Sequence, residues 1–221
     1  MVWGLRKRVG GLRTLKRLVY LISPNKLKAN FYLDLDKVLS FKNVKYFQLR
    51  LKNTKKKKII TIMNKIKKIT AKHKVKFIIN DNYNMACKPG VDGCHMGQLD
   101  GSFKIARSKL KNKILGITCH NSKILAKNAK QNKADYIAFG SFFNSKLKPN
   151  AKKADFKILK WANKNIKKPI VVIGGVNNLN YKKLLKAGAK YIAISSYIWD
   201  NPNLKPEIAI RKFKWKSLQM K

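Results

Sequence analysis

The sequence contains few acidic residues. Its 221 residues include nine Asp and Glu against fifty-two Lys and Arg, which gives a formal net charge of +43 at pH 7. It also has no run of eighteen apolar residues, which excludes a transmembrane helix and predicts no membrane partner. The three cysteines, Cys87, Cys94 and Cys119, lie in apolar segments and lack the spacing of a zinc site. They predict reduced core thiols and therefore a cytoplasmic location.

Arginine is scarce as well, with only seven residues. A strongly basic chain can bind nucleic acid, but specific recognition of phosphates and bases tends to use the forked guanidinium group of arginine. The lysines are spread over nearly every expected helix instead of forming one stripe. We therefore expect lysine-rich solvent faces and no specific nucleic-acid partner, although the charge alone could support weak binding of polyanions.

Four of the seven arginines lie in the first seventeen residues, which contain no acid. This segment lacks the serine enrichment of a transit peptide and the apolar stretch of a secretory signal. We interpret residues 1–17 as a basic N-terminal arm or short extra helix. Residues 18–221 form the expected catalytic domain.

From residue 18 onward, short apolar runs alternate with helical patterns. Eight strands are expected, at Leu18–Ser23, Tyr46–Leu51, Lys76–Asn80, Gly93–Met96, Ile114–Thr118, Tyr136–Gly140, Pro169–Ile173 and Tyr191–Ser195. Helices are expected at Leu33–Ser40, Lys55–Lys72, Phe103–Leu110, Ser122–Asn132, Ala154–Asn165, Leu179–Ala187 and Lys205–Gln219, and the short Asn82–Lys88 connection predicts only a turn or two of helix. The alternation indicates an α/β protein with a parallel sheet, and eight units in about 200 residues predict a single (β/α)8 TIM barrel.

Two carboxylates follow neighbouring expected strands. Asp81 comes directly after one, and Asp100 comes four residues after the next. The carboxyl ends of parallel strands meet at one end of a barrel, where such proteins keep their chemistry. Two acids placed there in so basic a chain predict a bound Mg²⁺, which one or two carboxylates can hold. The alternative is that each acid caps the helix that follows it. By contrast, Asp92 and Asp135 begin strands, so we expect them at the opposite, stabilising end.

Polar residues also gather at other strand ends. Gln48, Arg50 and Lys52 alternate along the second expected strand, which predicts that all three point into the barrel mouth towards an anionic ligand. The alternative is that these three side chains lie at a strand edge and extend into water. Gly174 and Gly175 follow the seventh strand, and Ser195 ends the eighth, so this pair of strand ends predicts a phosphate site.

Taken in order along the chain, these residues and the motifs around them resemble those of the thiamine-phosphate synthases. The resemblance covers about residues 18 to 202 and rests on Tyr20-Leu21-Ile22, Gln48-x-Arg50-x-Lys52, Asn80-Asp81, Asp92-Gly93-x-His95-x-Gly97-Gln98-x-Asp100, Gly116-x-Thr118-x-His120, Ala134-Asp135-Tyr136, Ile173-Gly174-Gly175 and Ile194-Ser195. The family fold is a (β/α)8 barrel. The resemblance implies that a pyrimidine diphosphate loses pyrophosphate and is captured by a thiazole phosphate.

The resemblance also implies residue roles. Asp81 and Asp100 hold Mg²⁺, while the diphosphate is held by Arg50, Lys52, Asn80 and Lys148. The pyrimidine is contacted by Gln48 and Thr118, and the thiazole phosphate by Ser145, Gly175, Ile194 and Ser195. Arg50, Lys52, Thr118 and Lys148 are the implied catalytic residues. The implied partners are these two small-molecule substrates, and whether the chain forms a homo-oligomer is left open.

The chain departs from the family pattern at two places. Thr118 stands where the family usually carries Ser, which keeps the hydroxyl group. Leu147 stands where a hydroxyl residue is usual, which puts the thiazole end of the site in doubt. The open alternative is therefore a thiazole tautomerase-like or inactive thiazole-phosphate-binding paralogue. A basic nucleic-acid-binding protein on a barrel scaffold is a further alternative.

Overall fold

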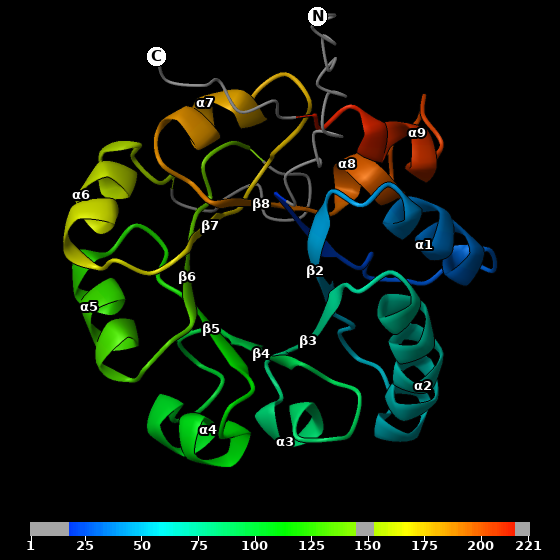
Figure 1. The fold of residues 1–221 in the computed structure, drawn as a ribbon, viewed down its shortest axis with the longest axis horizontal. Coiled ribbons are helices and arrows are strands. Elements are labelled where there is room, and N and C mark those ends of the chain that lie inside the picture. Colours follow the sequence, from blue (N-terminus) through cyan, green and yellow to red (C-terminus); the bar gives the residue numbers. More distant parts are fainter. Residues whose placement is uncertain (1–17, 145–152, 215–221) are drawn as a thin grey trace, which may run out of the picture.

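A computed structural model describes residues 18–144 and 153–214 of the chain. Its eight parallel strands close into a barrel in sequence order, with helices around the outside (Figure 1). The strands are β1 Val19–Ile22, β2 Val44–Leu49, β3 Lys76–Asn80, β4 Gly93–Met96, β5 Ile114–Thr118, β6 Tyr136–Phe139, β7 Ile170–Val172 and β8 Tyr191–Ile194. The expected TIM barrel is thus confirmed. The proposed arm, residues 1–17, lies outside the described residues.

The helices follow the expected alternation. They are α1 Phe31–Ser40, α2 Lys56–Lys72, α3 Tyr83–Ala86, α4 Phe103–Leu110, α5 Lys123–Gln131, α6 Lys157–Asn165, α7 Tyr181–Lys186, α8 Ser196–Trp199 and α9 Pro206–Arg211. The short α3 confirms that this connection holds little helix. The expectation missed α8, which begins directly after β8. The last expected helix, Lys205–Gln219, ends at Arg211 within the described residues, and its remaining expected part lies partly outside them.

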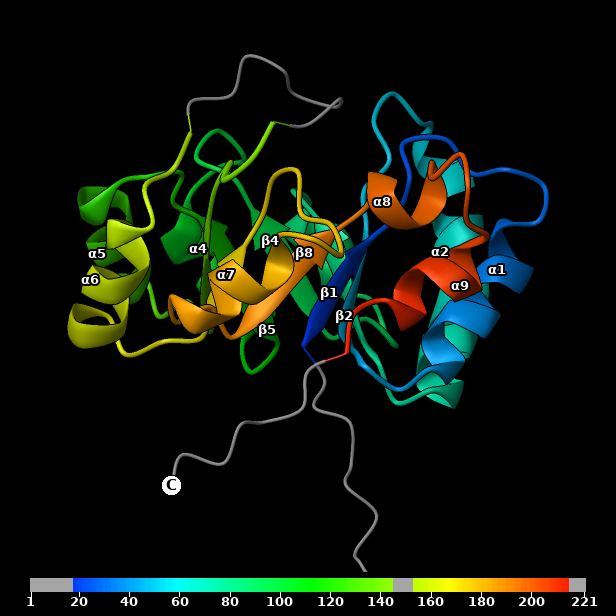
Figure 2. The same cartoon turned by 90° about the horizontal axis from the view of Figure 1, so that it is seen from above.

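The second strand was placed two residues too late. β2 begins at Val44, which pairs with Val19 of β1, and it ends at Leu49 instead of Leu51. Gln48 therefore points into the barrel, but Arg50 and Lys52 lie in the connection beyond the strand. The alternation of side chains along β2 therefore does not determine where the Arg50 and Lys52 side chains point. In the side view of Figure 2, the connections after β1 and β2 lie at the upper end of the barrel, beside α8.

Large and small side chains complement one another inside the barrel. Tyr20, Tyr46 and Tyr136 lie with ring centroids 5.2 to 5.6 Å apart. The neighbouring strand β5 has Gly116 beside them, where an added Cβ would meet Tyr136 Cζ at 1.9 Å. Glycine at position 116 therefore makes room for the Tyr136 ring, and the close packing holds the tyrosine hydroxyl groups in place.

Asp92 and Asp135 stabilise the opposite end of the barrel, as expected from their positions. Asp92 Oδ2 accepts a hydrogen bond from the Phe77 backbone N–H at 2.8 Å. Asp135 Oδ2 accepts one from the Leu115 N–H at 2.7 Å, and Arg107 Nη2 donates to the same oxygen at 2.7 Å. Asp92 thus links the start of β4 to β3, and Asp135 links the start of β6 to β5.

We expect Asp135→Ala to lower the free energy of unfolding by about 2 kcal/mol, because it leaves the partly buried Leu115 N–H and Arg107 Nη2 without their acceptor. Urea unfolding followed by circular dichroism would measure the loss. An unchanged midpoint and slope would contradict a stabilising role for this carboxylate.

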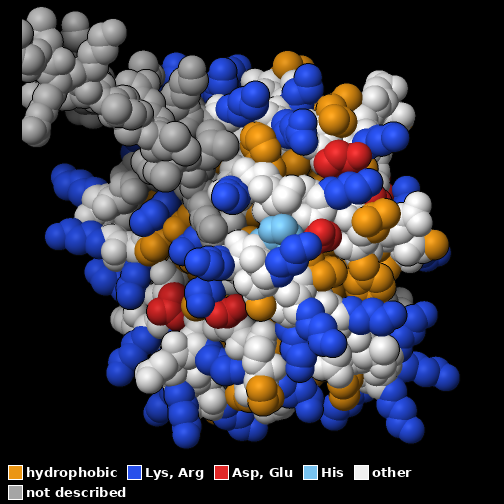
Figure 3. Space-filling view, turned by 45° about the vertical axis from the view of Figure 1, so that its right-hand side comes forward, with side chains coloured by type: hydrophobic (Ala, Val, Ile, Leu, Met, Phe, Trp, Pro, Cys, Tyr) orange, Lys and Arg blue, Asp and Glu red, His pale blue; other side chains and the backbone are white. Residues whose placement is uncertain are grey.

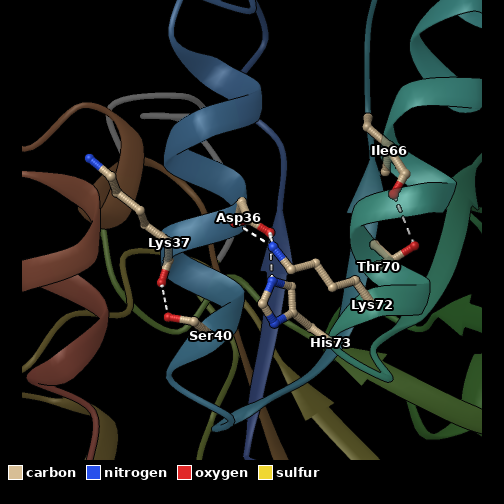
Figure 4. Close-up of polar contacts among 7 residues, drawn as sticks. All are labelled: Asp36, Lys37, Ser40, Ile66, Thr70, Lys72 and His73. Atoms are coloured by element: carbon tan, nitrogen blue, oxygen red, sulfur yellow. Dashed lines mark hydrogen bonds and ion pairs between the residues drawn. The ribbon is translucent and has the colours of Figure 1, made fainter.

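An exposed ion-pair cluster connects α1 to the end of α2 (Figure 4). Lys72 Nζ lies 2.9 Å and His73 Nε2 lies 2.7 Å from Asp36 Oδ1. The hydrogen bonds from Lys72 and His73 lower the pKa of Asp36. Exposed pairs of this kind contribute little individually, so the packing of α1 against α2 rests mainly on buried residues such as Leu35 and Ile66.

The surface agrees with the expectation of lysine-rich solvent faces. In the face shown in Figure 3, basic side chains are spread over the whole surface instead of forming a stripe. Within residues 18–144 and 153–214, no helix combines the length and the apolar character that a membrane crossing requires. The expectation of three core thiols was wrong for one of them. Cys94 and Cys119 are buried, but Cys87 is exposed because it ends α3 on the outer surface.

Candidate active site at the carboxyl ends of the strands

The two strand-end acids come together in the structure. Asp81 follows β3 directly, and its backbone N–H donates to the His95 carbonyl on β4 at 2.7 Å. Asp100 follows β4, and its Oδ2 accepts a hydrogen bond from the Gly97 N–H at 2.6 Å. Burial and the adjacent carboxyl group of Asp100, within hydrogen-bonding reach, raise the pKa of Asp81 to about 6. Two ionised carboxylates this close repel each other, and a bound cation would relieve that repulsion.

Neither acid caps a helix, so the capping alternative was wrong. The α3 cap is Asn82, whose side chain accepts a hydrogen bond from the Met85 N–H at 3.0 Å. The α4 cap is Ser102, whose hydroxyl accepts from the Ile105 N–H. Asp81 also adopts a φ of 64°, a left-handed conformation that costs energy for a residue with a Cβ. Neither carboxylate therefore caps a helix, although Asp100 Oδ2 accepts the local hydrogen bond from the Gly97 N–H.

Two cations face the carboxylate pair. The positive charges of Arg50 and Lys52 lower the pKa of Asp81, although burial and Asp100 outweigh them. Arg50 Nη1 donates to Asn25 Oδ1 at 3.0 Å, and its backbone N–H donates to Ser23 Oγ at 2.9 Å. The connection after β1 therefore holds the arginine beside the site.

A hydrogen-bonded chain of side chains crosses the barrel below the acids. Gln48 Nε2 donates to the Tyr20 hydroxyl at 3.0 Å, and the Tyr20 and Tyr136 hydroxyl oxygens are 2.7 Å apart. Tyr136 contacts His95 Nδ1 at 2.9 Å, and His95 Nε2 contacts Thr118 Oγ1 at 2.8 Å. The chain joins two of the expected substrate residues, Gln48 and Thr118, through three residues that do not appear among the expected roles.

The glycines after β7 allow two loops to approach closely. Gly174 and Gly175 have φ values of 102° and 58°. An added Cβ on Gly175 would meet the Asn144 carbonyl oxygen at 2.3 Å, and the Phe143 N–H donates to the Gly174 carbonyl at 3.1 Å. The loops after β6 and β7 therefore form one wall of the barrel mouth.

The structure describes some of the other residues expected to bind the phosphate groups, and the rest lie outside the described residues. Ser195 lies half-buried at the end of β8, and its hydroxyl donates to the Ser23 carbonyl at 3.1 Å. The Ile194 side chain packs in the core between the barrel and the helices, so only its backbone could contact a ligand. Ser145, Leu147 and Lys148 lie outside the described residues. Asn80 ends β3 at the barrel mouth, next to Asp81.

Sequence reasoning missed the roles of His95, Tyr20 and Tyr136. A signal was present for His95, because β4 alternation places it inward with Gly93, and the motif that ends in Asp100 contains it. Burial lowers the pKa of His95 to about 4, so the imidazole is neutral at pH 7. Gln98 was also missed, and its amide donates to the Thr118 carbonyl.

The carboxylate pair fits Mg²⁺ better than a metal that is held wholly by protein. Within the described ranges, no group of three or more His, Cys, Asp or Glu side chains could surround a metal. Mg²⁺ typically takes one or two carboxylates and completes its shell with water and substrate phosphates. Asp81 and Asp100 match this pattern, and the charges of Arg50 and Lys52 are close enough to act on Asp81.

Comparisons with known proteins agree with this architecture. The sequence model of a family described as "Thiamine monophosphate synthase" matches residues 19–198. A thiamine-phosphate synthase of Pelagibacter ubique is 52% identical over 90% of this chain and 97% of its own length. One from Erythrobacter litoralis is 37% identical over 82% of this chain and 87% of its own.

A solved structure is similar as well. The thiamine phosphate pyrophosphorylase of Pyrococcus furiosus superposes with a TM-score of 0.78 at 25% identity, covering 90% of this chain and 93% of that one. The relatives are named as synthases, so the tautomerase-like alternative is not favoured. Because the match spans nearly all of the barrel, the chain belongs to the thiamine monophosphate synthase family.

Proposed function

We propose that this chain is a thiamine-phosphate synthase, which couples hydroxymethylpyrimidine diphosphate to a thiazole phosphate and releases pyrophosphate. The bond between the exocyclic carbon and the diphosphate oxygen breaks, and the thiazole nitrogen forms the new bond to that carbon. The observation that supports this reaction best is the Asp81–Asp100 pair facing Arg50 and Lys52. It offers a place for a metal beside a place for a diphosphate.

The electrostatics of the site suit a leaving diphosphate. As the carbon–oxygen bond breaks, negative charge grows on the leaving oxygens, and fixed cations stabilise it most strongly in the transition state. Arg50 is suited to hold two oxygens at once, and Asn25 orients its guanidinium group. Mg²⁺ bound by Asp81 and Asp100 would supply further positive charge to the phosphate oxygens. No nucleophilic side chain is needed, because the thiazole nitrogen attacks.

The remaining roles follow the expectations. Gln48 and Thr118 contact the pyrimidine, Asn80 contacts the diphosphate, and Gly175 and Ser195 contact the thiazole phosphate. Ile194 contributes through its backbone. Ser145 and Lys148 keep their expected roles as predictions. The cytoplasmic location and a homo-oligomer likewise stay predictions.

The test is to mix the purified protein with both substrates and Mg²⁺ and to measure thiamine phosphate and pyrophosphate. We expect one pyrophosphate for each thiamine phosphate, and no product after chelation of the metal. No product at saturating concentrations of both substrates would contradict the synthase. Conversion of the thiazole phosphate alone would favour the tautomerase-like alternative.

The raised pKa of Asp81 predicts how stability depends on pH in the metal-free protein. The folded-state pKa, about 6, exceeds the ordinary value of 3.8, so the protonated carboxyl group favours folding. This contribution is present below about pH 4 and is lost as the pH rises through 6. We expect the melting temperature of the wild type, relative to Asp81→Asn, to fall between pH 4 and pH 7.

Mg²⁺ should reverse that loss, because it binds the ionised pair. We expect Mg²⁺ to raise the melting temperature of the wild type at pH 7.5 but not at pH 4.5, and to have little effect on Asp81→Asn. Differential scanning fluorimetry at the two pH values would measure both effects. Equal stabilisation of wild type and variant would contradict a metal at this pair.

A further inference from the structure

The buried chain from Gln48 to Thr118 can carry its hydrogen bonds in only two directions. The two ring nitrogens of His95 contact only hydroxyl groups, those of Tyr136 and Thr118, and a neutral imidazole donates through one nitrogen and accepts through the other. Each tyrosine hydroxyl has one hydrogen to donate. Tyr20 and Tyr136 are 1% and 0% exposed, so an undonated hydroxyl hydrogen would be costly there. A complete chain therefore needs all its members to donate in the same direction.

The orientation of the Gln48 amide selects the direction. Gln48 Nε2 donates to the Tyr20 oxygen, so the Tyr20 hydroxyl must donate to its other partner, Tyr136. Tyr136 then donates to His95 Nδ1, which leaves Nε2 to carry the ring hydrogen and donate to Thr118 Oγ1. A flipped amide would reverse every one of these bonds.

The direction decides what the two ends of the chain offer to a ligand. With Nε2 of Gln48 engaged by Tyr20, its carbonyl oxygen Oε1 remains to accept a hydrogen bond. With His95 donating to Thr118 Oγ1, the Thr118 hydroxyl keeps its hydrogen to donate. In the reversed chain, Gln48 would offer a donor and Thr118 an acceptor. The two ends are coupled, although they stand on β2 and β5.

We propose that Tyr20, Tyr136 and His95 are positioning residues that make the site select an aminopyrimidine over the matching oxopyrimidine. This inference rests on the proposed function, in which Gln48 and Thr118 contact the pyrimidine. An aminopyrimidine offers a donating amino group and accepting ring nitrogens, which complement an acceptor on Gln48 and a donor on Thr118. An oxo group with an adjacent ring N–H presents the inverted pattern, which matches only the reversed chain.

The barrel core is built to hold this direction. The Tyr136 ring lies nearly parallel to the His95 ring, at an interplanar angle of 7°, and Gly116 leaves space for it. Tyr46 packs against both tyrosines of the hydrogen-bonded chain, and its ring centroid lies 5.2 Å from that of Tyr20 and 5.6 Å from that of Tyr136. A ligand that needed the reversed pattern would have to turn every group in this packed interior.

Nitrogen NMR of the ligand-free protein tests the direction itself. Long-range ¹H–¹⁵N spectra distinguish the two neutral forms of histidine, and a His95→Gln variant identifies the signals of His95. We expect hydrogen on Nε2. Hydrogen on Nδ1 would show the opposite direction and overturn the inference, whatever the protein binds.

Binding measurements test the selectivity. Calorimetry with 4-amino-5-hydroxymethyl-2-methylpyrimidine and its 4-oxo analogue, each as the diphosphate, gives the ratio of the two affinities. We expect the wild type to prefer the amino compound by about tenfold or more. Tyr20→Phe removes the acceptor that orients the Gln48 amide, so the ratio should fall by about three- to tenfold, the scale of one hydrogen bond.

Tyr46→Phe is the matched control. Tyr46 packs beside the hydrogen-bonded chain, but its hydroxyl hydrogen-bonds with Tyr191 and takes part in none of the hydrogen bonds that join Gln48 to Thr118. We expect it to keep the wild-type ratio. The inference would be overturned if Tyr20→Phe kept the wild-type affinity ratio, or if Tyr46→Phe lowered that ratio as much as Tyr20→Phe does. If the wild type binds neither compound, the proposed function fails instead, and the NMR result still decides the direction. If Tyr20→Phe does not fold, the tautomer in the wild type decides.

Discussion

Replacing Asp81 with Asn should reduce turnover by about a hundredfold or more, and Asp100→Asn should do the same. Each change removes a charge that holds the proposed metal where negative charge develops in the reaction. The metal-free Asp81→Asn protein should nevertheless melt at a higher temperature than the wild type at pH 7.5. It no longer places two carboxylates together, and Asn tolerates the left-handed φ of 64° better than Asp does.

Steady-state kinetics with Mg²⁺ varied would measure the loss of turnover, and scanning fluorimetry would measure the gain in stability. Glu207→Gln on α9 is the control, because it removes the same charge away from the strand ends. Unchanged turnover of both Asp variants at limiting Mg²⁺ would remove the metal from this pair. A lower melting temperature would contradict the repulsion that the raised pKa of Asp81 indicates.

Arg50→Lys should have the second largest effect, a loss of about ten- to a hundredfold in kcat/KM. A lysine ammonium group carries the same charge but is not a planar fork, so it cannot hold two phosphate oxygens in the same way. It would also lose the orientation that Asn25 gives the guanidinium group. We expect pyrophosphate to inhibit this variant about tenfold more weakly than the wild type.

Inhibition by pyrophosphate at fixed substrate concentrations would measure this effect. Arg211→Lys, at the end of α9, is the control. It makes the same arginine-to-lysine change outside the site and should leave inhibition by pyrophosphate unchanged. Equal inhibition of the wild type and Arg50→Lys would place the diphosphate elsewhere in the barrel mouth.

The fold was predictable because each strand is a short apolar run between turn residues. The alternation of strands and helices then left few topologies, and β3, β4 and β5 have the expected bounds. Boundaries were less predictable where polar residues enter a strand. β2 begins at Val44 because its backbone pairs with β1, although the polar residue Lys45 interrupts the apolar run there.

The site was partly predictable for a similar reason. A parallel barrel places all carboxyl strand ends together, so Asp81 and Asp100 could be expected to meet. The buried chain could not be expected in this way. Tyr20 and Tyr136 are 116 positions apart, and their contact depends on the curvature of the closed barrel and on the space left by Gly116. Periodicity shows which way a side chain points, but not which side chain it meets across the interior.

The few acids of this chain are largely engaged. Asp36, Asp92 and Asp135 form ion pairs with cations, and Asp81 and Asp100 face each other at the barrel mouth. Most lysines consequently have no acidic counterpart, and two copies of the protein repel each other at low ionic strength. Dissolved salt screens this repulsion. The concentration of counter-ions therefore governs how readily copies of this enzyme can approach one another, and any self-association would be favoured by salt instead of being dissolved by it.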